Sequence, residues 1–209
     1  MANPPFNVNE IQKDRLEDDK QRFPFGMPRN DNGNYLWIQL FYAALNKTGR
    51  AGFVMANSAS DARGSEQDIR QQLIEDDGVD VMVAVSSNFF YTVTLPCALW
   101  FLDKNKPAQN KDKVLFIDAR NLGYMKDRVL RDFTQDDLNT VCETFHNWQV
   151  GDGFENEAGF CKSVELAELE KHDYVLTPGR YVGAAEEEDD GEPFAEKMAR
   201  LTGQLKTQF

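Results

Sequence analysis

Three predominantly apolar runs in the middle of the chain constrain the fold more than any other feature. They are VDVMVAV (79–85), LPCALWFL (95–102) and KVLFIDA (113–119), and the first of them is rich in β-branched residues. Continuous apolar runs of this length are typical of strands buried on both faces, as in a sheet that helices cover. A fourth short run, GFVMAN (52–57), suits another buried strand. The chain therefore predicts an α/β protein with a sheet of four strands.

Two segments have the spacing of helices. One precedes GFVMAN, and the other lies between GFVMAN and VDVMVAV. Apolar residues recur every three or four positions from Tyr35 to Lys47 and again from Glu66 to Asp76, and Gly49 is expected to cap the first helix. KNKPAQNKDK (104–113) reads as a hairpin-like turn between the last two strands. With so few helices, the order predicts part of a Rossmann-like sheet with an antiparallel pair at its edge.

The remainder of the chain has a different pattern. Thr134 can cap a helix with Asp137 three residues on, and Ser163 is expected to open a second helix. A final helix from Pro193 carries an apolar stripe at near-heptad spacing, which suits packing against another helix. The predicted divisions are the sheet (1–130), a helical extension containing HDYVLTPGRYVG (131–182), an acidic linker (183–192) and a C-terminal helix (193–209).

Charge and composition exclude several classes of function. Thirty-five acidic residues against twenty-three basic ones give a net charge of −12, which argues against a chain that holds nucleic acid by its own charge. The three Cys and two His have no spacing typical of zinc sites, so no metal is expected. No apolar run is long enough to cross a bilayer, which predicts a cytoplasmic protein without a membrane partner. Four acids outside any motif are interpreted as solvated charges: Asp61, Asp76, Asp77 and Asp80.

The first signal of chemistry is the sequence Asn3-Pro4-Pro5-Phe6. A nucleobase amine that is extruded from a duplex needs two acceptors, and it needs an aromatic ring on the face of the base. Asn3 offers a side-chain amide oxygen, Pro4 offers a backbone carbonyl and Phe6 offers a ring. The prolines stiffen the turn, which preorganises these acceptors. Two prolines at a strand exit are also common as simple chain punctuation.

Taken with the rest of the chain, this motif resembles a known family. NPPF is the signature of adenine-specific DNA methyltransferases that use S-adenosylmethionine. Further stretches resemble the modification subunit of type I restriction-modification systems in the same order along the chain. They include GRAGFVMANSASDARGSEQDIRQQL, VSSNFFYTVTLPCALWFLDKNK, DKVLFIDARNLGYMKDR, FHNWQ, GFCKSVELAELEKHDYVLTPGRYVG and EPFAEKMARL.

The resemblance implies roles for particular residues. Asn3, Pro4, Pro5 and Phe6 correspond to the catalytic motif that binds the target adenine. The loop NFFYT corresponds to a second element that contacts the base, in which Phe90 is expected to stack on the extruded base and Phe89 is the alternative. Packing of these aromatic residues in a core is the competing interpretation. The apolar stripe of the last helix resembles the family's partner contact, and its members are Phe194, Met198, Leu201 and Leu205.

The resemblance also implies cofactor and partners. The family binds S-adenosylmethionine through a glycine-rich turn ahead of NPPF, whereas only two residues precede the motif here, and GDGFENEAGF (151–160) follows a predicted helix. The expectation is the C-terminal part of a modification subunit that neither binds the cofactor nor methylates DNA alone. Its expected partners are DNA through the assembled complex, a specificity subunit and a second modification subunit, with a homodimer as a further arrangement. The alternative function is a non-catalytic interaction module derived from such a subunit.

Overall fold

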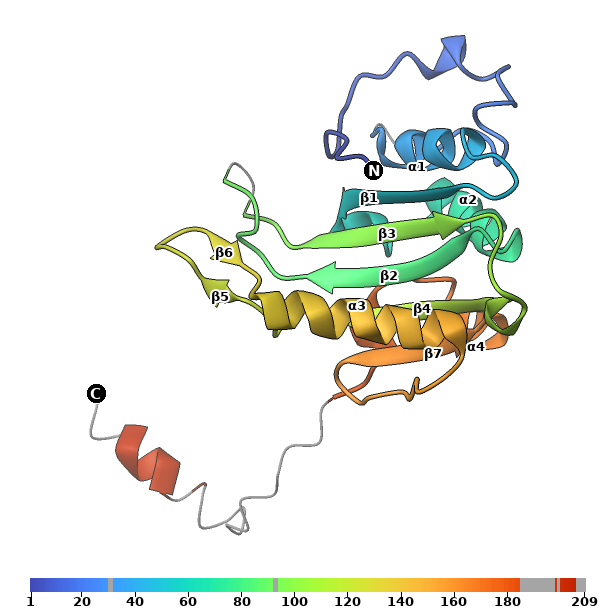
Figure 1. Ribbon diagram of the computed structural model, residues 1–209. Helices are drawn as coiled ribbons and strands as arrows, with labels where there is room; N and C mark the ends of the chain where they lie inside the picture. Colours follow the sequence, from blue (N-terminus) through green and yellow to red (C-terminus); the bar gives the residue numbers. More distant parts are fainter. Residues whose placement is uncertain (30–31, 92–93, 185–197, 199, 206–209) are drawn as a thin grey trace.

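The computed structural model describes residues 1–29, 32–91, 94–184, 198 and 200–205 (Figure 1). Its strands and helices follow one another in a fixed order with short 3-10 turns between some of them. The elements are α1 (Asn34–Ala43), β1 (Arg50–Ala56), α2 (Ser65–Glu75), β2 (Val79–Val85), β3 (Cys97–Asp103), β4 (Lys113–Asp118), β5 (Tyr124–Met125), β6 (Arg131–Asp132), α3 (Gln135–Val150), β7 (Cys161–Glu165) and α4 (Leu166–Lys171).

The main sheet has the order β1-β3-β2-β4-β7, and β5 pairs with β6 in a separate hairpin. Strands β2 and β4 are parallel, whereas β3 runs antiparallel to both of its neighbours, β1 and β2. Strand β7 closes the far edge antiparallel to β4. The α/β fold with antiparallel pairing at the edge is therefore confirmed, and β2 covers the residues predicted for it.

Three local predictions were wrong. The segment between β3 and β4 is not a hairpin connection, because β2 lies between these two strands. Ser163 lies inside strand β7 rather than at a helix start, and α4 begins only at Leu166. Helix α1 ends at Ala43, with Ala44 as its cap, so Gly49 is not the C-cap. The capping box of α3, between Thr134 and Asp137, is confirmed.

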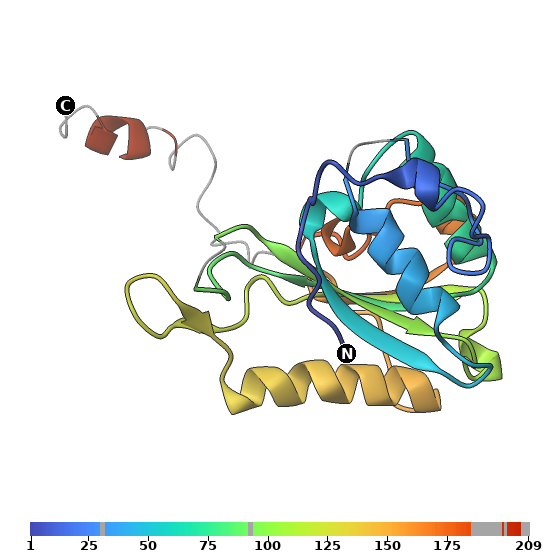
Figure 2. The same cartoon turned by 90° about the horizontal axis from the view of Figure 1, so that it is seen from above.

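Helices cover the two faces of the sheet unequally. Figure 2 shows α1 and α2 on one face and α3 along the other. The first face buries a large cluster that joins Tyr35, Leu73 and Trp100 to the segment 174–182. The second face buries a smaller cluster, in which Trp148 of α3 packs over β2, β4 and β7. Alternation of side chains along each strand assigns each residue to its face.

A buried arginine ties the segment after α4 to the first face. Arg70 of α2 is 1% exposed, and its guanidinium donates to the carbonyl oxygens of Tyr174 (2.6 Å) and Ala62 (2.7 Å) and to the hydroxyl of Tyr35 (3.1 Å). Tyr181 stacks on Phe116 of β4 with 4.3 Å between ring centroids. The HDYVLTPGRYVG stretch is thus part of the core of the sheet.

The end of the chain is described only in part. Most of the predicted acidic linker, and Phe194 of the predicted apolar stripe, lie outside the described residues. Residues 198 and 200–205 are helical, and the side chains of Met198, Leu201 and Leu205 are exposed. Within the described residues, none of the helices combines the length and the apolar character that crossing a membrane requires.

Candidate active site at the carboxyl edge of the sheet

The NPPF motif begins where the N-terminal residues join the sheet. Ala2 forms a parallel bridge with Phe53 of β1, its N–H donates to the carbonyl of Gly52 (3.0 Å), and its carbonyl accepts from the N–H of Val54 (3.2 Å). Because the pairing is parallel, Asn3 and the residues after it leave the sheet toward the carboxyl end of β1. In open α/β sheets this is the edge at which ligands bind.

The residues that follow are held in a fixed turn. Pro4 is buried and Asn3 is exposed. Asn7 has a positive φ of 51°, and its backbone N–H donates to the side chain of Asn34 (3.0 Å), while the Asn34 amide donates back to the Asn7 side chain (2.8 Å). Asn34 is buried at the start of α1. This reciprocal pair, which sequence reasoning missed, fastens the end of the motif to the first helix.

The second predicted element reaches the same edge. Strand β3 is antiparallel to both β1 and β2, and its first residue, Cys97, pairs with Ala56 at the end of β1 and with Val85 at the end of β2. The loop 86–91 that follows β2 therefore emerges on the side at which the NPPF turn emerges. The structure thus places both predicted base-contacting elements at the carboxyl ends of parallel strands.

The two phenylalanines of that loop have different surroundings. The rings of Phe89 and Phe133 lie 4.4 Å apart, and Phe89 packs against the smaller core cluster. Phe90 is half-buried and belongs to neither core cluster of the described residues. The next residue, Tyr91, is 81% exposed. Packing therefore accounts for Phe89, whereas neither core cluster of the described residues accounts for Phe90.

A further polar pair stands at the end of β4. Arg120 donates from Nε to Asp118 Oδ1 (2.8 Å) and from Nη2 to Asp118 Oδ2 (2.5 Å), and this pairing raises the pKa of Arg120. A Cβ on Gly179 would lie 2.6 Å from the guanidinium, so the pair packs directly against the turn that contains this glycine. Since both charges are mutually satisfied, the pair orders the edge without offering a free group.

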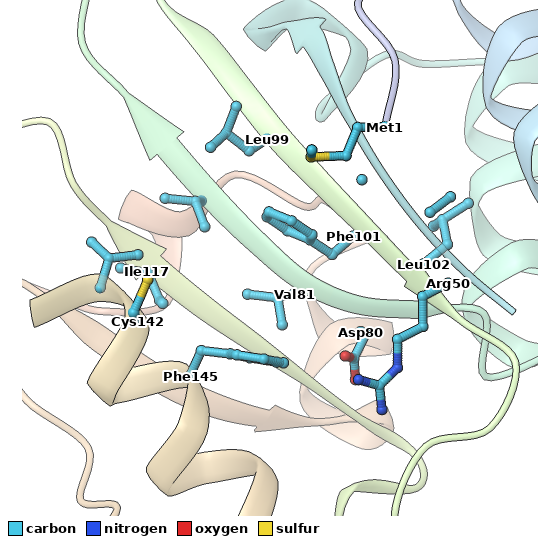
Figure 3. A pocket seen from close by; sticks show the side chains of 14 residues that line it. Met1, Arg50, Asp80, Val81, Leu99, Phe101, Leu102, Ile117, Cys142 and Phe145 are labelled. Carbon is cyan, nitrogen blue, oxygen red and sulfur yellow. The ribbon is translucent and has the colours of Figure 1, made fainter. Parts of the chain in front are cut away.

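An apolar cavity of about 390 Å³ lies away from this edge, between α3 and the face of β1, β3 and β2 (Figure 3). Met1, Phe101 and the thiol-bearing Cys142 line it, and Asp80 and Arg50 close one end. Asp80 is only 4% exposed, so its interpretation as a solvated charge was wrong. Burial raises the pKa of Asp80 to about 6. The cavity has too few polar groups to hold a nucleoside.

The described residues do not fit an S-adenosylmethionine cradle. None of the turns after β1, β2 or β4 is rich in glycine. In the glycine-rich stretch 151–160, Gly151 adopts the left-handed conformation that caps α3, and the stretch then leads into β7. It is a helix-to-strand connection, whereas a dinucleotide-type cradle follows a strand. Across the part of the chain that is described, no three His, Cys, Asp or Glu side chains gather as metal ligands would.

Comparisons with known proteins identify the family. The family model for the N-6 DNA methylases matches residues 1–190. The HindI methylase subunit of Haemophilus influenzae, a type I restriction enzyme subunit, is 49% identical over 210 residues, which cover 100% of this chain and 47% of that protein. The MjaIX methylase subunit of Methanocaldococcus jannaschii is 42% identical, over 99% of this chain and 38% of its own length.

Solved structures agree in fold. The methyltransferase subunit of a type I restriction-modification system from Streptococcus thermophilus superposes with a TM-score of 0.76 at 21% identity, over 87% of this chain and 37% of that one. The chain spans less than half the length of the curated relatives it matches. It belongs to the N-6 DNA methylase family, and its relatives there are methylase subunits of type I restriction enzymes.

Proposed function

We propose that this chain supplies the target-base side of an adenine-specific DNA methyltransferase that acts as a modification subunit of a type I restriction-modification complex. One observation carries the proposal. The NPPF turn and the loop with Phe90 leave the sheet at one edge, where β3 joins the ends of β1 and β2 through Cys97. A rigid acceptor turn opposite an aromatic loop is what an extruded base requires.

The chemistry of this edge is the recognition of an exocyclic amine. Adenine carries two N–H groups on N6, and Asn3 Oδ1 and the Pro4 carbonyl oxygen can each accept one of them. The acceptors increase electron density on the nitrogen that becomes methylated, and they hold the amine so that its lone pair, perpendicular to the ring plane, is open to the methyl donor. Neither group is charged, which suits a protein with an excess of acidic residues.

S-adenosylmethionine is the methyl donor that the family implies, and we infer that it is held outside the residues described here. The open sheet face supports this division. Helices α1 and α2 both cover the face opposite α3, and the cavity beneath Phe101 is left on the α3 side of β1 and β3. In a doubly wound sheet, helices cover both faces. The cofactor-binding part of the methyltransferase is therefore expected to pack there.

The role of the aromatic loop is tested by a matched pair of substitutions, Phe90→Ala and Phe89→Ala. Loss of a stacking ring costs about 1–3 kcal/mol per base. We therefore expect Phe90→Ala to lower kcat/KM for DNA by about 5- to 150-fold, with unchanged thermal stability, in the assembled methyltransferase. Phe89→Ala removes a half-buried packing contact and should instead lower the unfolding free energy by about 1–2 kcal/mol.

Equal losses of activity for both variants, or a stability loss for Phe90→Ala alone, would contradict this assignment. A fluorescent adenine analogue at the target position provides a second measurement. Its emission should rise when the base leaves the stack of the parent complex, and the rise should shrink in Phe90→Ala.

We also propose that the C-terminal helix contacts a specificity subunit through the apolar stripe of Phe194, Met198, Leu201 and Leu205. Leu201→Asp should weaken co-purification with that subunit because a charge replaces an exposed leucine at the contact. Thr202→Asp, which adds the same charge to the neighbouring exposed position of the helix, is the control. Equal recovery of the specificity subunit with both variants would contradict the proposal that this helix contacts that subunit.

A further inference from the structure

The hairpin of β5 and β6 extends from the edge at which the candidate site lies. Tyr124 pairs with Asp132 and Met125 with Arg131, and residues 126–130 form the tip. Figures 1 and 2 both show this hairpin reaching beyond the body of the sheet, on the side of the loop that follows β2. The proposed function assigns no role to it.

The hairpin carries a small positive charge in an acidic protein. Residues 124–132 hold three basic residues and two acidic residues, whereas the whole chain has a net charge of −12. Arg120 is committed to Asp118, but Lys126 only forms an exposed pair with Asp132 (3.0 Å). Such exposed pairs contribute little and exchange readily for another anion. Arg128 stands at the tip, exposed, with no hydrogen bond or ion pair among the described residues.

Exposed aromatic and apolar groups lie beside these cations. Tyr124 is 47% exposed and Val129 is 57% exposed. The hydrogen bond from Lys126 to Asp132 raises the pKa of Lys126. Basic groups interleaved with exposed aromatic rings are typical of surfaces that bind nucleic acid.

The base of the hairpin is joined to the base-contacting loop. The N–H of Arg131 donates to the carbonyl of Asn88 (2.8 Å), and Phe133, just after β6, packs on Phe89. Gly123 completes the joint with a φ of +84°. A Cβ there would lie 2.8 Å from the carbonyl oxygen of Asp132 and 3.3 Å from the Phe89 ring. The hairpin is therefore in direct contact with the loop that carries Phe90.

Hydrogen bonds within the tip hold its backbone in one conformation. Asp127 Oδ1 accepts from the N–H groups of Val129 (2.8 Å) and Leu130 (2.7 Å), and the Lys126 N–H donates to the Leu130 carbonyl (2.9 Å). The hydrogen bond from Leu130, and then that from Val129, lower the pKa of Asp127. A preformed tip loses little entropy when it binds.

We propose that residues 124–132 form a phosphate-binding arm, which holds the DNA backbone beside the extruded base through Lys126 and Arg128. The proposal rests on the proposed function for the placement of the base. The contact would fix the position of the strand relative to the loop that carries Phe90. The arm thus adds a local electrostatic contact with DNA, although the net charge of the whole chain is negative.

The test compares Lys126→Ala/Arg128→Ala with Lys47→Ala/Lys111→Ala in the assembled methyltransferase. The control lysines are exposed and precede β1 and β4, at the opposite end of the sheet. DNA affinity is measured from 50 to 200 mM salt. Loss of two phosphate contacts lowers the salt slope by about 1.8, so the ratio of parent to variant affinity should be about 12-fold larger at 50 mM than at 200 mM. The control variant should keep the slope of the parent.

If Lys126→Ala/Arg128→Ala keeps the salt slope of the parent, the proposal of a phosphate-binding arm is overturned. A loss of co-purifying specificity subunit with an unchanged slope would also overturn it and would assign the hairpin to a protein contact. Because the measurement is of binding, it is independent of methyl transfer. If the arm fails while Asn3→Ala abolishes methylation, the proposed function stands; if Asn3→Ala still methylates DNA, the proposed function fails irrespective of the arm.

Discussion

Replacement of Asn3 by alanine is expected to abolish methylation by the assembled methyltransferase while leaving the fold intact. Asn3 is exposed at the carboxyl edge, between Ala2, which pairs with β1, and the buried Pro4. The backbone that carries its amide group is therefore held in place on both sides. Removing one preorganised hydrogen-bonding group from an active site lowers kcat by about 10²- to 10³-fold. Methyl incorporation into DNA under saturating substrate measures the loss.

Two further variants make the result specific. Asn3→Asp keeps an acceptor oxygen at the same distance from the backbone and should recover part of the lost rate. Asn139→Ala, on the exposed surface of α3, should retain the rate of the parent. Full activity of Asn3→Ala in an assembly that methylates DNA would exclude this residue from catalysis.

Replacement of Arg70 by methionine should destabilise the protein by about 1–3 kcal/mol for each buried acceptor that is left without a donor. The guanidinium connects α2 to the Tyr174 carbonyl, the Ala62 carbonyl and the Tyr35 hydroxyl. Methionine fills similar space but leaves these buried oxygens without their donors. Each unsatisfied oxygen lowers the free energy of unfolding. Denaturant unfolding followed by tryptophan fluorescence measures the change, with Trp100 in the same cluster as Tyr35.

The shape of the guanidinium can be separated from its charge. Arg70→Lys keeps a positive charge but lacks the planar fork, so it should recover only part of the stability. Arg180→Met removes an exposed arginine and should change the unfolding free energy by less than about 0.5 kcal/mol. An Arg70→Met protein as stable as the Arg180→Met protein would show that the segment 173–176 is held by packing alone.

Local sequence patterns predicted those elements whose determinants are local. Strand β2 was predicted residue for residue because its apolar run is bounded by turn residues on both sides. The start of α3 was predicted because Thr134 and Asp137 satisfy each other's backbone groups without help from elsewhere. Where partners are distant the prediction failed. Ser163, Leu166 and Leu169 have helical spacing, yet pairing with β4 draws Ser163 into β7 opposite Leu115.

The order of strands was also beyond local patterns. A charged turn before β4 indicates that the chain reverses, but it does not indicate which strand receives the next one. In the fold, β3 inserts between β1 and β2, and β4 adds beyond β2. This arrangement depends on the faces that α2 and the segment around Tyr181 must bury.

The candidate site was predicted from motif chemistry, whereas its supports were not. The acceptors and the ring of NPPF were identified from residue types, whereas the roles of the two phenylalanines came from the resemblance to the family. The Asn7–Asn34 clamp links positions 27 residues apart, and nothing in either neighbourhood indicates the other. The hairpin did leave a signal, because three basic residues fall within residues 126–131 of an acidic chain. The charge of short segments indicates this hairpin, whereas the net charge of the whole chain does not.

The position of Cys142 gives the apolar cavity an experimental use. Cys97 and Cys161 are buried, while Cys142 is exposed on α3 and lines the cavity beside Phe101. A thiol-alkylating dye will thus modify one site in the native protein, on the helix that borders the cavity at the sheet face that we expect a further part of the methyltransferase to cover. The chain therefore carries its own reporter of assembly, since the rate of alkylation at this single thiol records whether that face is open or occluded.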